Sequence, residues 1–414
     1  MPYIDELGVK ALKAKEELIG ITTDKKNSAL KLMAENLIKN SETILKANEM
    51  DVITARRKGT KESLIDRLVL NMSRIEGMAK GLIETSEFAD PIGRVLFEKD
   101  MPQGMKLKKI SVPMGVIGII YESRPNVTCD AAGLCFKAGS AVILRGGSDA
   151  INSNKAIVGV LREALAMIGI SRDSIQLVED TSRDTAAEMM KADNYIDLLI
   201  PRGGAALIES VVQNATIPVI ETGTGNCHLY IDSIFNEKSA IDIAVNAKCS
   251  RPGVCNAIET LLVHKDVYKH ILPKIEEELA KWKVQLRACE KSIRILKNAI
   301  PATEDDWATE YLDYILAIKV VDSIEEAVEH INKYGTKHSE AIITDLEESK
   351  NKFMRNVDAA CVYVNTSTRF TDGGEFGLGA EIGISTQKLH ARGPMGANEI
   401  TTYKYIIEGN GQIR

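Results

Sequence analysis

The sequence predicts an α/β protein in which a doubly wound, mostly parallel sheet is followed by a second α/β unit. From residue 116 onward, short apolar segments of strand length alternate with segments of helical periodicity. Polar loops that carry Gly or Arg follow four of these strands, at 121–126, 145–148, 201–204 and 221–226. Because ligands of such sheets bind at the carboxyl ends of strands, these loops are the expected site.

The composition is that of an ordinary globular protein, with 44% hydrophobic and 27% charged residues among 414. A net charge of −6 without a long basic block disfavours nucleic acid and anionic membrane as partners. The N-terminal residues lack the features of a signal peptide, and no apolar run reaches the length of about 18 residues that a membrane span needs. Seven cysteines without a C-x-x-C pair argue against a disulfide framework, so cytoplasm is the expected location.

The first part of the chain is expected to be helical, because apolar residues recur three and four apart over residues 3–85. A β-hairpin is expected next, with strands at 95–99 and 105–110 around a turn at 100–104 that contains Pro and Gly. The last strand is expected at 400–407. We expect this strand and the hairpin to form one small sheet that extends across a homodimer, because an exposed edge invites pairing.

The two α/β units follow the same alternation. In the first, strands are expected at 116–120, 141–144, 175–178, 196–200 and 218–220, with helices at 129–137, 151–168, 184–191 and 204–214. In the second, strands are expected at 258–263, 283–288, 315–321, 340–344 and 360–364, with helices at 266–280, 324–334 and 346–355. The polar, Gly-rich stretch 365–394 is too long for an ordinary connection, which indicates a functional or disordered loop.

One cysteine lies in a segment typical of a covalent nucleophile, 250–257 (SRPGVCNA). Pro252 and Gly253 form a turn that presents Cys255 in one orientation. If Asn256-Ala257 opens a helical turn, free backbone N–H groups face the sulfur, favour the thiolate and bind an oxyanion. The alternative is a cysteine that only packs, because free cysteines are among the most buried residue types.

Other motifs are incomplete. No Walker A sequence is present, and neither 223–225 nor 377–379 completes the G-x-G-x-x-G dinucleotide fingerprint, so a nicotinamide cofactor would have to be held in another way. Cys227-His228 has no partner at metal-ligand spacing, and no metal site is predicted.

Five blocks carry a resemblance to a known family. They are 112–128 (VPMGVIGIIYESRPNVT), 144–148 (LRGGS), 221–228 (ETGTGNCH), 251–256 (RPGVCN) and 389–396 (LHARGPMG). In this order, over nearly the whole chain, they resemble the γ-glutamyl phosphate reductases, a branch of the aldehyde dehydrogenase superfamily. The resemblance implies an aldehyde dehydrogenase-like fold with a Rossmann-like NADP-binding domain (1–94 and 112–222), an α/β catalytic domain (223–398) and a small β oligomerisation arm (95–111 and 399–414).

The resemblance also implies roles for particular residues. Cys255 is the expected nucleophile, and Asn126 replaces the oxyanion-hole asparagine of ordinary aldehyde dehydrogenases, whose Pro-Trp-Asn segment is here 122–126 (ESRPN). Glu221 aligns with the general base and Glu310 with the glutamate that contacts the nicotinamide ribose, although each carboxylate could instead cap a loop or a helix. The remaining expected contacts are Gly203 and Gly204 to the cofactor, and Arg124, Arg251 and Arg392 to the substrate.

Cofactor choice is expected to depend on Arg145, which stands where a superfamily lysine contacts the adenosine ribose. Its planar, permanently charged fork suits the 2′-phosphate of NADP, and the alternative is an arginine merely solvated at a strand end. The implied reaction is NADPH-dependent reduction of L-glutamyl 5-phosphate to L-glutamate 5-semialdehyde and phosphate, the second step of proline biosynthesis, by a homodimer or higher homo-oligomer. Two alternatives stay open: an aldehyde oxidiser that releases free acid, and a catalytically silent binding or structural protein.

Overall fold

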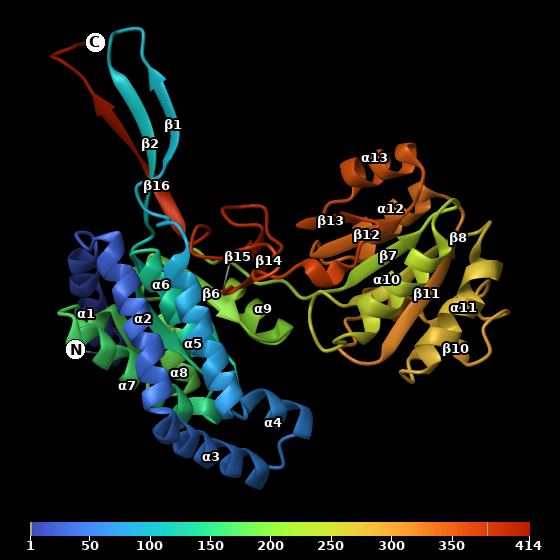
Figure 1. The fold of residues 1–414 in the computed structure, drawn as a ribbon, viewed down its shortest axis with the longest axis horizontal. Coiled ribbons are helices and arrows are strands. Elements are labelled where there is room, and N and C mark those ends of the chain that lie inside the picture. Colours follow the sequence, from blue (N-terminus) through green and yellow to red (C-terminus); the bar gives the residue numbers. More distant parts are fainter. Residues whose placement is uncertain (1, 123, 379) are drawn as a thin grey trace. The chain divides into compact units, whose positions relative to one another are not determined.

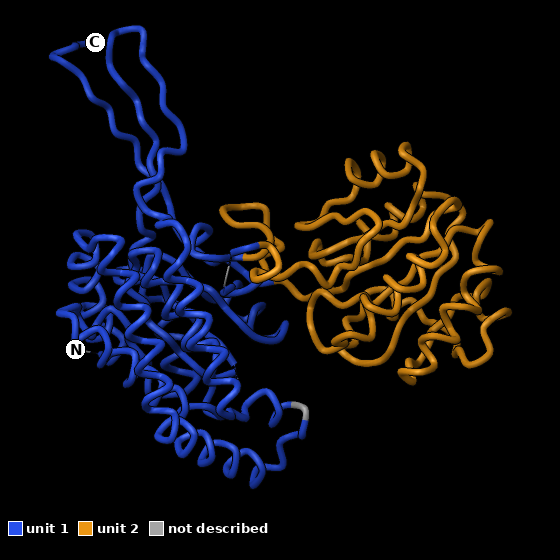
Figure 2. The backbone as a smooth tube through the Cα atoms, viewed as in Figure 1, with its two compact units in different colours: residues 1–222, 377–383, 395–414 blue, residues 223–376, 384–394 orange. Residues whose placement is uncertain are grey.

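The computed structural model describes residues 2–122, 124–378 and 380–414 (Figure 1). They form two compact units: unit 1 comprises residues 1–222, 377–383 and 395–414, and unit 2 comprises 223–376 and 384–394 (Figure 2). The predicted catalytic domain therefore loses two segments, 377–383 and 395–398, to unit 1. Contacts remote in sequence decide this, because a Cβ on Gly383 would lie 2.6 Å from Thr222 Cγ2 and 3.2 Å from Arg202 Nη1, both in unit 1.

Unit 1 begins with a helical layer, which confirms the periodicity of the first 85 residues. Its helices are α1 Tyr3–Leu18, α2 Thr23–Lys39, α3 Ser41–Arg57, α4 Glu62–Leu68 and α5 Met72–Glu87. Side-chain caps set where two of them begin: Thr22 accepts the Lys25 N–H before α2, and Asn71 accepts the Arg74 N–H before α5. Fully buried Leu30, from α2, is part of the core beneath this layer.

A four-stranded parallel sheet is the centre of unit 1. Its strands are β3 Val116–Tyr121, β4 Ala141–Arg145, β5 Ile175–Leu177 and β6 Leu198–Arg202, in the order β5-β4-β3-β6. The helices between and after them are α6 Pro125–Lys137, α7 Ile151–Met167, α8 Arg183–Met190 and α9 Ala205–Asn214. The strand order reverses between β3 and β6, and a parallel sheet of this kind binds ligands at the carboxyl ends of the strands at that point.

The strand predicted at 218–220 is wrong. Only a single bridge, between Val219 and Leu199, joins this stretch to β6. Pro218 has no N–H to donate, so a longer ladder is disfavoured there.

The arm of unit 1 is a three-stranded antiparallel sheet, β1-β2-β16, as predicted for one chain. Its strands are β1 Val95–Asp100, β2 Lys106–Pro113 and β16 Thr401–Glu408, and Figure 1 shows it projecting from the helices of unit 1. The Lys109 ammonium lies 3.5 Å from the centre of the Tyr403 ring, a cation–π contact across the last two strands.

Unit 2 is built on a seven-stranded parallel sheet in the order β10-β9-β11-β8-β7-β12-β13. The strands are β7 Cys227–Ile231, β8 Ile258–His264, β9 Gln285–Ala288, β10 Ala299–Pro301, β11 Ile315–Val321, β12 Ser339–Ile343 and β13 Cys361–Val364. The helices are α10 Glu237–Cys249, α11 Tyr268–Ala280, α12 Ile324–Tyr334 and α13 Glu347–Asn356. Two short strands, β14 Gly383–Ser385 and β15 Gly393–Met395, complete the secondary structure of the stretch 365–394.

Three elements of unit 2 were not predicted: β7, α10 and β10. Strand β7 is buried along its whole length between β8 and β12, so its Cys227-His228 pair belongs to the sheet. Helix α10 packs small residues such as Ala240, Ala244 and Ala247 into the core, which leaves little apolar periodicity in the sequence. Within the described part of the chain, no helix is long and apolar enough to cross a membrane.

Candidate active site

Cys255 lies in unit 2, in the turn that joins α10 to β8, and its side chain is half-buried. The Ala257 N–H donates to the carbonyl of Val254 at 3.1 Å and closes the turn. The helical turn that was considered at Asn256-Ala257 does not open a helix, because β8 begins at Ile258 and pairs with β7 on one side and β11 on the other. Cys255, the predicted nucleophile, is therefore presented by a turn at the amino end of a central strand, without a helix N-terminus.

Arg369, which the sequence analysis missed, holds this turn from the far end of the chain. It lies in the 3₁₀ turn Thr368–Phe370, where its Nε donates to Ser250 Oγ at 3.0 Å and its Nη1 donates to Asn256 Oδ1. The Asn256 amide in turn donates to the carbonyl of Thr371 at 2.8 Å. Residues on both sides of Cys255 are thus fixed to one short segment.

Charges of both signs surround Arg369, next to the Cys255 turn. Burial and the neighbouring charge of Arg251 lower the pKa of Arg369, whereas Asp372 and a thiolate at Cys255 act to raise it. Arg251 itself is exposed and begins the turn. A guanidinium close to a cysteine favours a thiolate and an anionic substrate group, and the charge of Asp372 acts against this.

Gly225 lies against the Cys255 backbone. A Cβ at this position would stand 1.6 Å from the Cys255 carbonyl oxygen and 2.5 Å from its Cα, so no side chain fits. The Gly225 N–H donates to Glu310 Oε1 at 2.6 Å. Glu310, which the resemblance implies contacts the nicotinamide ribose, therefore accepts a hydrogen bond from Gly225. This is the residue whose backbone lies against that of Cys255 within unit 2.

Gly225→Ala is expected to lower kcat by about a hundredfold, because the new methyl group must displace the Cys255 backbone by an ångström or more. Steady-state kinetics and the rate of Cys255 alkylation by iodoacetamide measure the effect. Gly253→Ala is the matched control in the same site, since its Cβ would meet only the Leu312 carbonyl oxygen, at 3.6 Å. Equal activity in the two variants would contradict the steric argument.

In unit 1, the loops after β3 and β6 meet where the strand order reverses. The Glu122 N–H donates to the carbonyl of Arg202 at 3.1 Å, and the Gly204 N–H donates to Glu122 Oε2 at 2.9 Å. A Cβ on Gly203 would lie 2.7 Å from the same carboxylate oxygen. The predicted cofactor residues Gly203 and Gly204 therefore lead into α9, and the Gly204 N–H already donates to the Glu122 carboxylate. Ser123, between Glu122 and Arg124, lies outside the described residues.

Arg145, at the carboxyl end of β4, is half-buried and directed at the loop after β5. Its Nη2 donates to the carbonyls of Thr181 and Ser182 at 2.8 and 3.1 Å. Burial lowers the pKa of this guanidinium and Asp180 raises it. Its Nε is buried, and no atom of the described residues accepts a hydrogen bond from it.

Asn126, predicted for the oxyanion hole, is exposed in the first turn of α6. Its Nδ2 donates to Asp130 Oδ2 at 3.2 Å. Burial raises the pKa of Asp130 to about 6, and the hydrogen bond from Asn126 and the charge of Arg202 act against this rise. Asn126 and Cys255 belong to different units, so their joint oxyanion hole stays a prediction.

The other predicted residues are placed as follows. Arg124 is the residue before α6. Glu221 is half-buried. The hydroxyl of its neighbour Thr222 donates to the Pro201 carbonyl at the end of β6. Arg392, in unit 2, donates to Asp358 Oδ1 at 2.7 Å and lowers the pKa of that carboxylate. Its guanidinium is committed to Asp358, and its substrate role stays a prediction.

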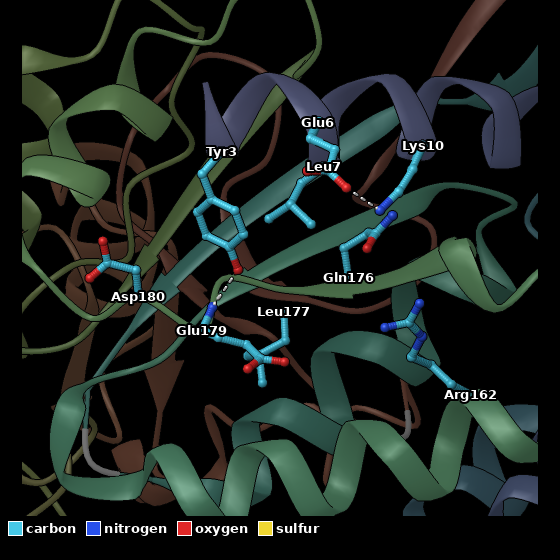
Figure 3. Close-up of a pocket in the computed structure, with 9 residues that line it drawn as sticks. All are labelled: Tyr3, Glu6, Leu7, Lys10, Arg162, Gln176, Leu177, Glu179 and Asp180. Atoms are coloured by element: carbon cyan, nitrogen blue, oxygen red, sulfur yellow. Dashed lines mark hydrogen bonds and ion pairs between the residues drawn. The ribbon is translucent and has the colours of Figure 1, made fainter. Parts of the chain in front are cut away.

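A pocket of about 430 Å³ lies in unit 1 between α1 and the end of β5 (Figure 3). The Tyr3 hydroxyl accepts the Glu179 N–H at 2.9 Å across it, and Glu6 pairs with Lys10 along α1. Asp180, which also lines it, precedes the two carbonyls that Arg145 binds. None of the predicted site residues lines this pocket. In the described residues, no group of three or more His, Cys, Asp or Glu is arranged to hold a metal ion.

Comparisons with known proteins agree over the whole chain. The model of the aldehyde dehydrogenase family matches residues 4–293. The chain is 57% identical over 412 residues to the γ-glutamyl phosphate reductase of Caldanaerobacter subterraneus subsp. tengcongensis, which covers 99% of this chain and 100% of that protein. The chain belongs to the aldehyde dehydrogenase family, among the γ-glutamyl phosphate reductases. The family resemblance and the aldehyde dehydrogenase-like fold are both confirmed, and the chain is an oxidoreductase of this family.

Solved structures extend the likeness. The crystal structure of γ-glutamyl phosphate reductase from Thermotoga maritima has a TM-score of 0.96 and 51% identity, with 99% of both chains covered. An engineered glycolyl-CoA reductase solved with bound NADP⁺ has a TM-score of 0.69 at 14% identity, with 97% of this chain and 96% of that chain covered, and shares the fold alone. Enzymes of the aldehyde dehydrogenase family use nicotinamide cofactors.

Proposed function

We propose that this chain reduces L-glutamyl 5-phosphate to L-glutamate 5-semialdehyde and phosphate with NADPH, through a thioester on Cys255, in the second step of proline biosynthesis. The observation that carries the proposal is the half-buried Cys255 turn, clamped by Arg369 beside Arg251, in a chain of this family. A cysteine next to two cations is suited to attack an acyl group whose leaving group is an anion.

The residues of unit 1 fit a nicotinamide dinucleotide. The half-buried guanidinium of Arg145 lies at the end of β4, and its Nε has no partner among the described residues. The loop of Gly203 and Gly204 leads into α9 where the strand order reverses. The Gly204 N–H, at the residue before α9, donates to the carboxylate of Glu122, so this end of the helix accepts an anionic group. The bound cofactor supplies the hydride.

Cys255 forms the first bond. Its thiolate attacks the carbonyl carbon of the acyl phosphate, the carbon–oxygen bond to phosphate breaks, and a thioester remains. The Cys255 N–H and the Asn126 amide are the proposed donors to the oxyanion, and loss of one such donor costs roughly 10²–10³ in rate. Phosphate leaves as a stable anion, so no proton donor is required. Reduction consumes no water, so Glu221 is not required to act as a general base in this direction.

Arg251 and Arg369 are the proposed phosphate contacts in unit 2. Both act on the Cys255 environment, and a guanidinium pairs well with a phosphoryl group. Arg124 and Arg392 keep their proposed roles at the substrate. The cytoplasm remains the proposed location.

The test of function is the reverse reaction. NADP reduction by glutamate 5-semialdehyde is expected to depend on inorganic phosphate, because phosphate must cleave the thioester. Phosphate-independent NADP reduction that releases free glutamate would instead favour the aldehyde oxidiser, and a lack of any turnover would favour a silent binding protein.

Arg145→Ala is expected to raise the KM for NADPH about ten- to a hundredfold, because a charge-assisted contact contributes about 1.5–3 kcal/mol. The KM for NADH should stay nearly constant, since NADH has no 2′-phosphate. Initial rates with both cofactors measure the difference, and Arg145→Lys separates charge from the planar fork. An equal rise for both cofactors would mean that Arg145 only holds the carbonyls of Thr181 and Ser182.

The arm is proposed to join two copies of the chain. Its two edge strands, β1 and β16, expose apolar side chains to solvent in the single chain: Val95, Leu96, Phe97, Tyr403, Tyr405 and Ile407. Unpaired edges with such side chains favour association. Light scattering at micromolar concentration should report a dimer or larger, and Phe97→Lys with Tyr405→Lys should shift it toward monomer. A fully active monomer in the unmodified protein would refute the arm's role.

A further inference from the structure

Cys227, the first residue of β7, lies beside the turn that carries Cys255. Its Sγ donates to the Cys255 carbonyl oxygen at 3.1 Å, and the chain two residues earlier, at Gly225, touches the Cys255 backbone. The charge of a thiolate at Cys255 also acts to raise the pKa of Cys227. We infer that Cys227 is a resolving thiol, which forms a reversible disulfide with Cys255 after a hydroperoxide oxidises the nucleophile.

The two sulfurs differ in access. Cys255 is half-buried, whereas Cys227 is fully buried and has no exposed surface. Burial above all raises the pKa of Cys227 well beyond its usual range, which keeps it a protonated, unreactive thiol. A hydroperoxide therefore reaches Cys255 first, and Cys227 then reacts with the oxidised sulfur of the residue whose backbone it already contacts. This inference rests on the proposed function only because it requires a reactive Cys255 thiol.

His338 is the group placed to take the Cys227 proton. Its Nδ1 lies 3.7 Å from Cys227 Sγ and 2.8 Å from Ser339 Oγ, at the start of β12 next to β7. The ring nitrogen of an imidazole that carries no hydrogen can accept a proton from a thiol. The pairing of β7 with β12 holds this base and the thiol on adjacent strands.

The chemistry balances in two steps. The Cys255 thiolate attacks one oxygen of the hydroperoxide, the O–O bond breaks, and a sulfenic acid forms as water or an alcohol leaves. The Cys227 sulfur then attacks the Cys255 sulfur, the S–O bond breaks, and the hydroxide leaves as water with the proton from Cys227. Two thiols lose two electrons in total, and the hydroperoxide gains them. A dithiol reductant then reduces the disulfide and restores both thiols.

The test treats the full chain with hydrogen peroxide and then with dithiothreitol. In the wild-type protein, peptide mass spectrometry without reduction should find Cys227 joined to Cys255, and dithiothreitol should restore most of the lost activity. In Cys227→Ser, the sulfenic acid has no partner and oxidises on to sulfinic acid, which thiols do not reduce. The fraction of activity recovered should therefore be about tenfold smaller, each variant being compared with its own untreated rate.

Cys249→Ser is the matched control, because Cys249 is also buried and lies six residues before Cys255 at the end of α10. It should recover as the wild type does. Absence of the Cys227–Cys255 peptide in the oxidised wild type overturns the inference without any variant, as does equal recovery in Cys227→Ser. A protein that shows no acyl-phosphate chemistry before oxidation would instead contradict the proposed function, so the two failures are distinguishable.

Discussion

Cys255→Ser should abolish reduction of the acyl phosphate, with kcat at least about a thousandfold lower, because a serine hydroxyl without a paired base is a poor nucleophile. The turn should still form, since its Ala257–Val254 hydrogen bond and the Asn256 contacts to Arg369 do not use the sulfur. Phosphate-dependent NADP reduction and thermal unfolding, measured side by side, separate lost chemistry from lost fold.

Cys289→Ser is the control for this experiment, because Cys289 is also half-buried in unit 2 and its sulfur serves Ser292 and the Val320 N–H. Its kcat should stay within a few-fold of the wild type. Substantial turnover by Cys255→Ser would remove the thioester from the mechanism and leave only direct hydride transfer to the acyl phosphate.

Lys248→Met should lower the free energy of unfolding by about 3–5 kcal/mol, the usual result of removing one partner of a buried ion pair. Lys248 Nζ lies 2.5 Å from Glu259 Oε2, and both side chains are 0% exposed. Burial lowers the pKa of Lys248 and raises that of Glu259, and each partner opposes the other's shift. Without the ammonium, Glu259 is a buried carboxylate with only the Leu312 N–H as a described donor. Chemical denaturation measures the change.

Lys238→Met on the same helix is the matched control, because its partner Asp242 and Lys238 are both largely exposed. That pair should contribute no more than about 0.5 kcal/mol. Adding Glu259→Gln to Lys248→Met should recover more than half of the lost stability, since the neutral amide still accepts the Leu312 N–H. A loss of similar size in Lys238→Met would contradict the argument from burial.

The destabilisation in Lys248→Met should also depend on pH. Removal of the cation raises the pKa of Glu259 further above its ordinary value of 4.5, so the folded state holds a proton that the unfolded state has released. Stability then increases as the pH falls, and the deficit should be largest above pH 8 and smaller near pH 5. A deficit that does not change over this range would mean that the carboxylate is not the source.

Much of the fold was predictable from local pattern. Strands such as β3 and β8 are short apolar runs bounded by turns, and α12 has apolar residues at helical spacing, so their type follows from neighbouring residues alone. The arm was predictable because strand formers at 95–110 and 400–407 had no core of their own. Cys255 could be identified because a Pro-Gly turn before a strand-forming run presents one thiol, and the five matching blocks placed it in a family.

Elements whose evidence is not local were missed or misread. Strand β7 was not predicted, and its Cys227-His228 pair was considered only as a pair of metal ligands. Only its two neighbours in the sheet make those polar side chains part of a buried strand. The helical turn after Cys255 was plausible in isolation, yet pairing of β8 with β7 and β11 extends the backbone directly from Ile258.

The sequence by itself determined the alternation of strands and helices and the family, and it predicted Cys255 as the nucleophile. Tertiary structure alone decided what surrounds Cys255. Arg369 reaches Asn256 across 113 residues, and Glu310 reaches Gly225 across 85. Segment 377–383 likewise belongs to unit 1, although residues 376 and 384 on either side of it belong to unit 2. No short window of sequence contains both residues of either hydrogen bond, because each forms only after the sheet of unit 2 has fixed the ends of its loops.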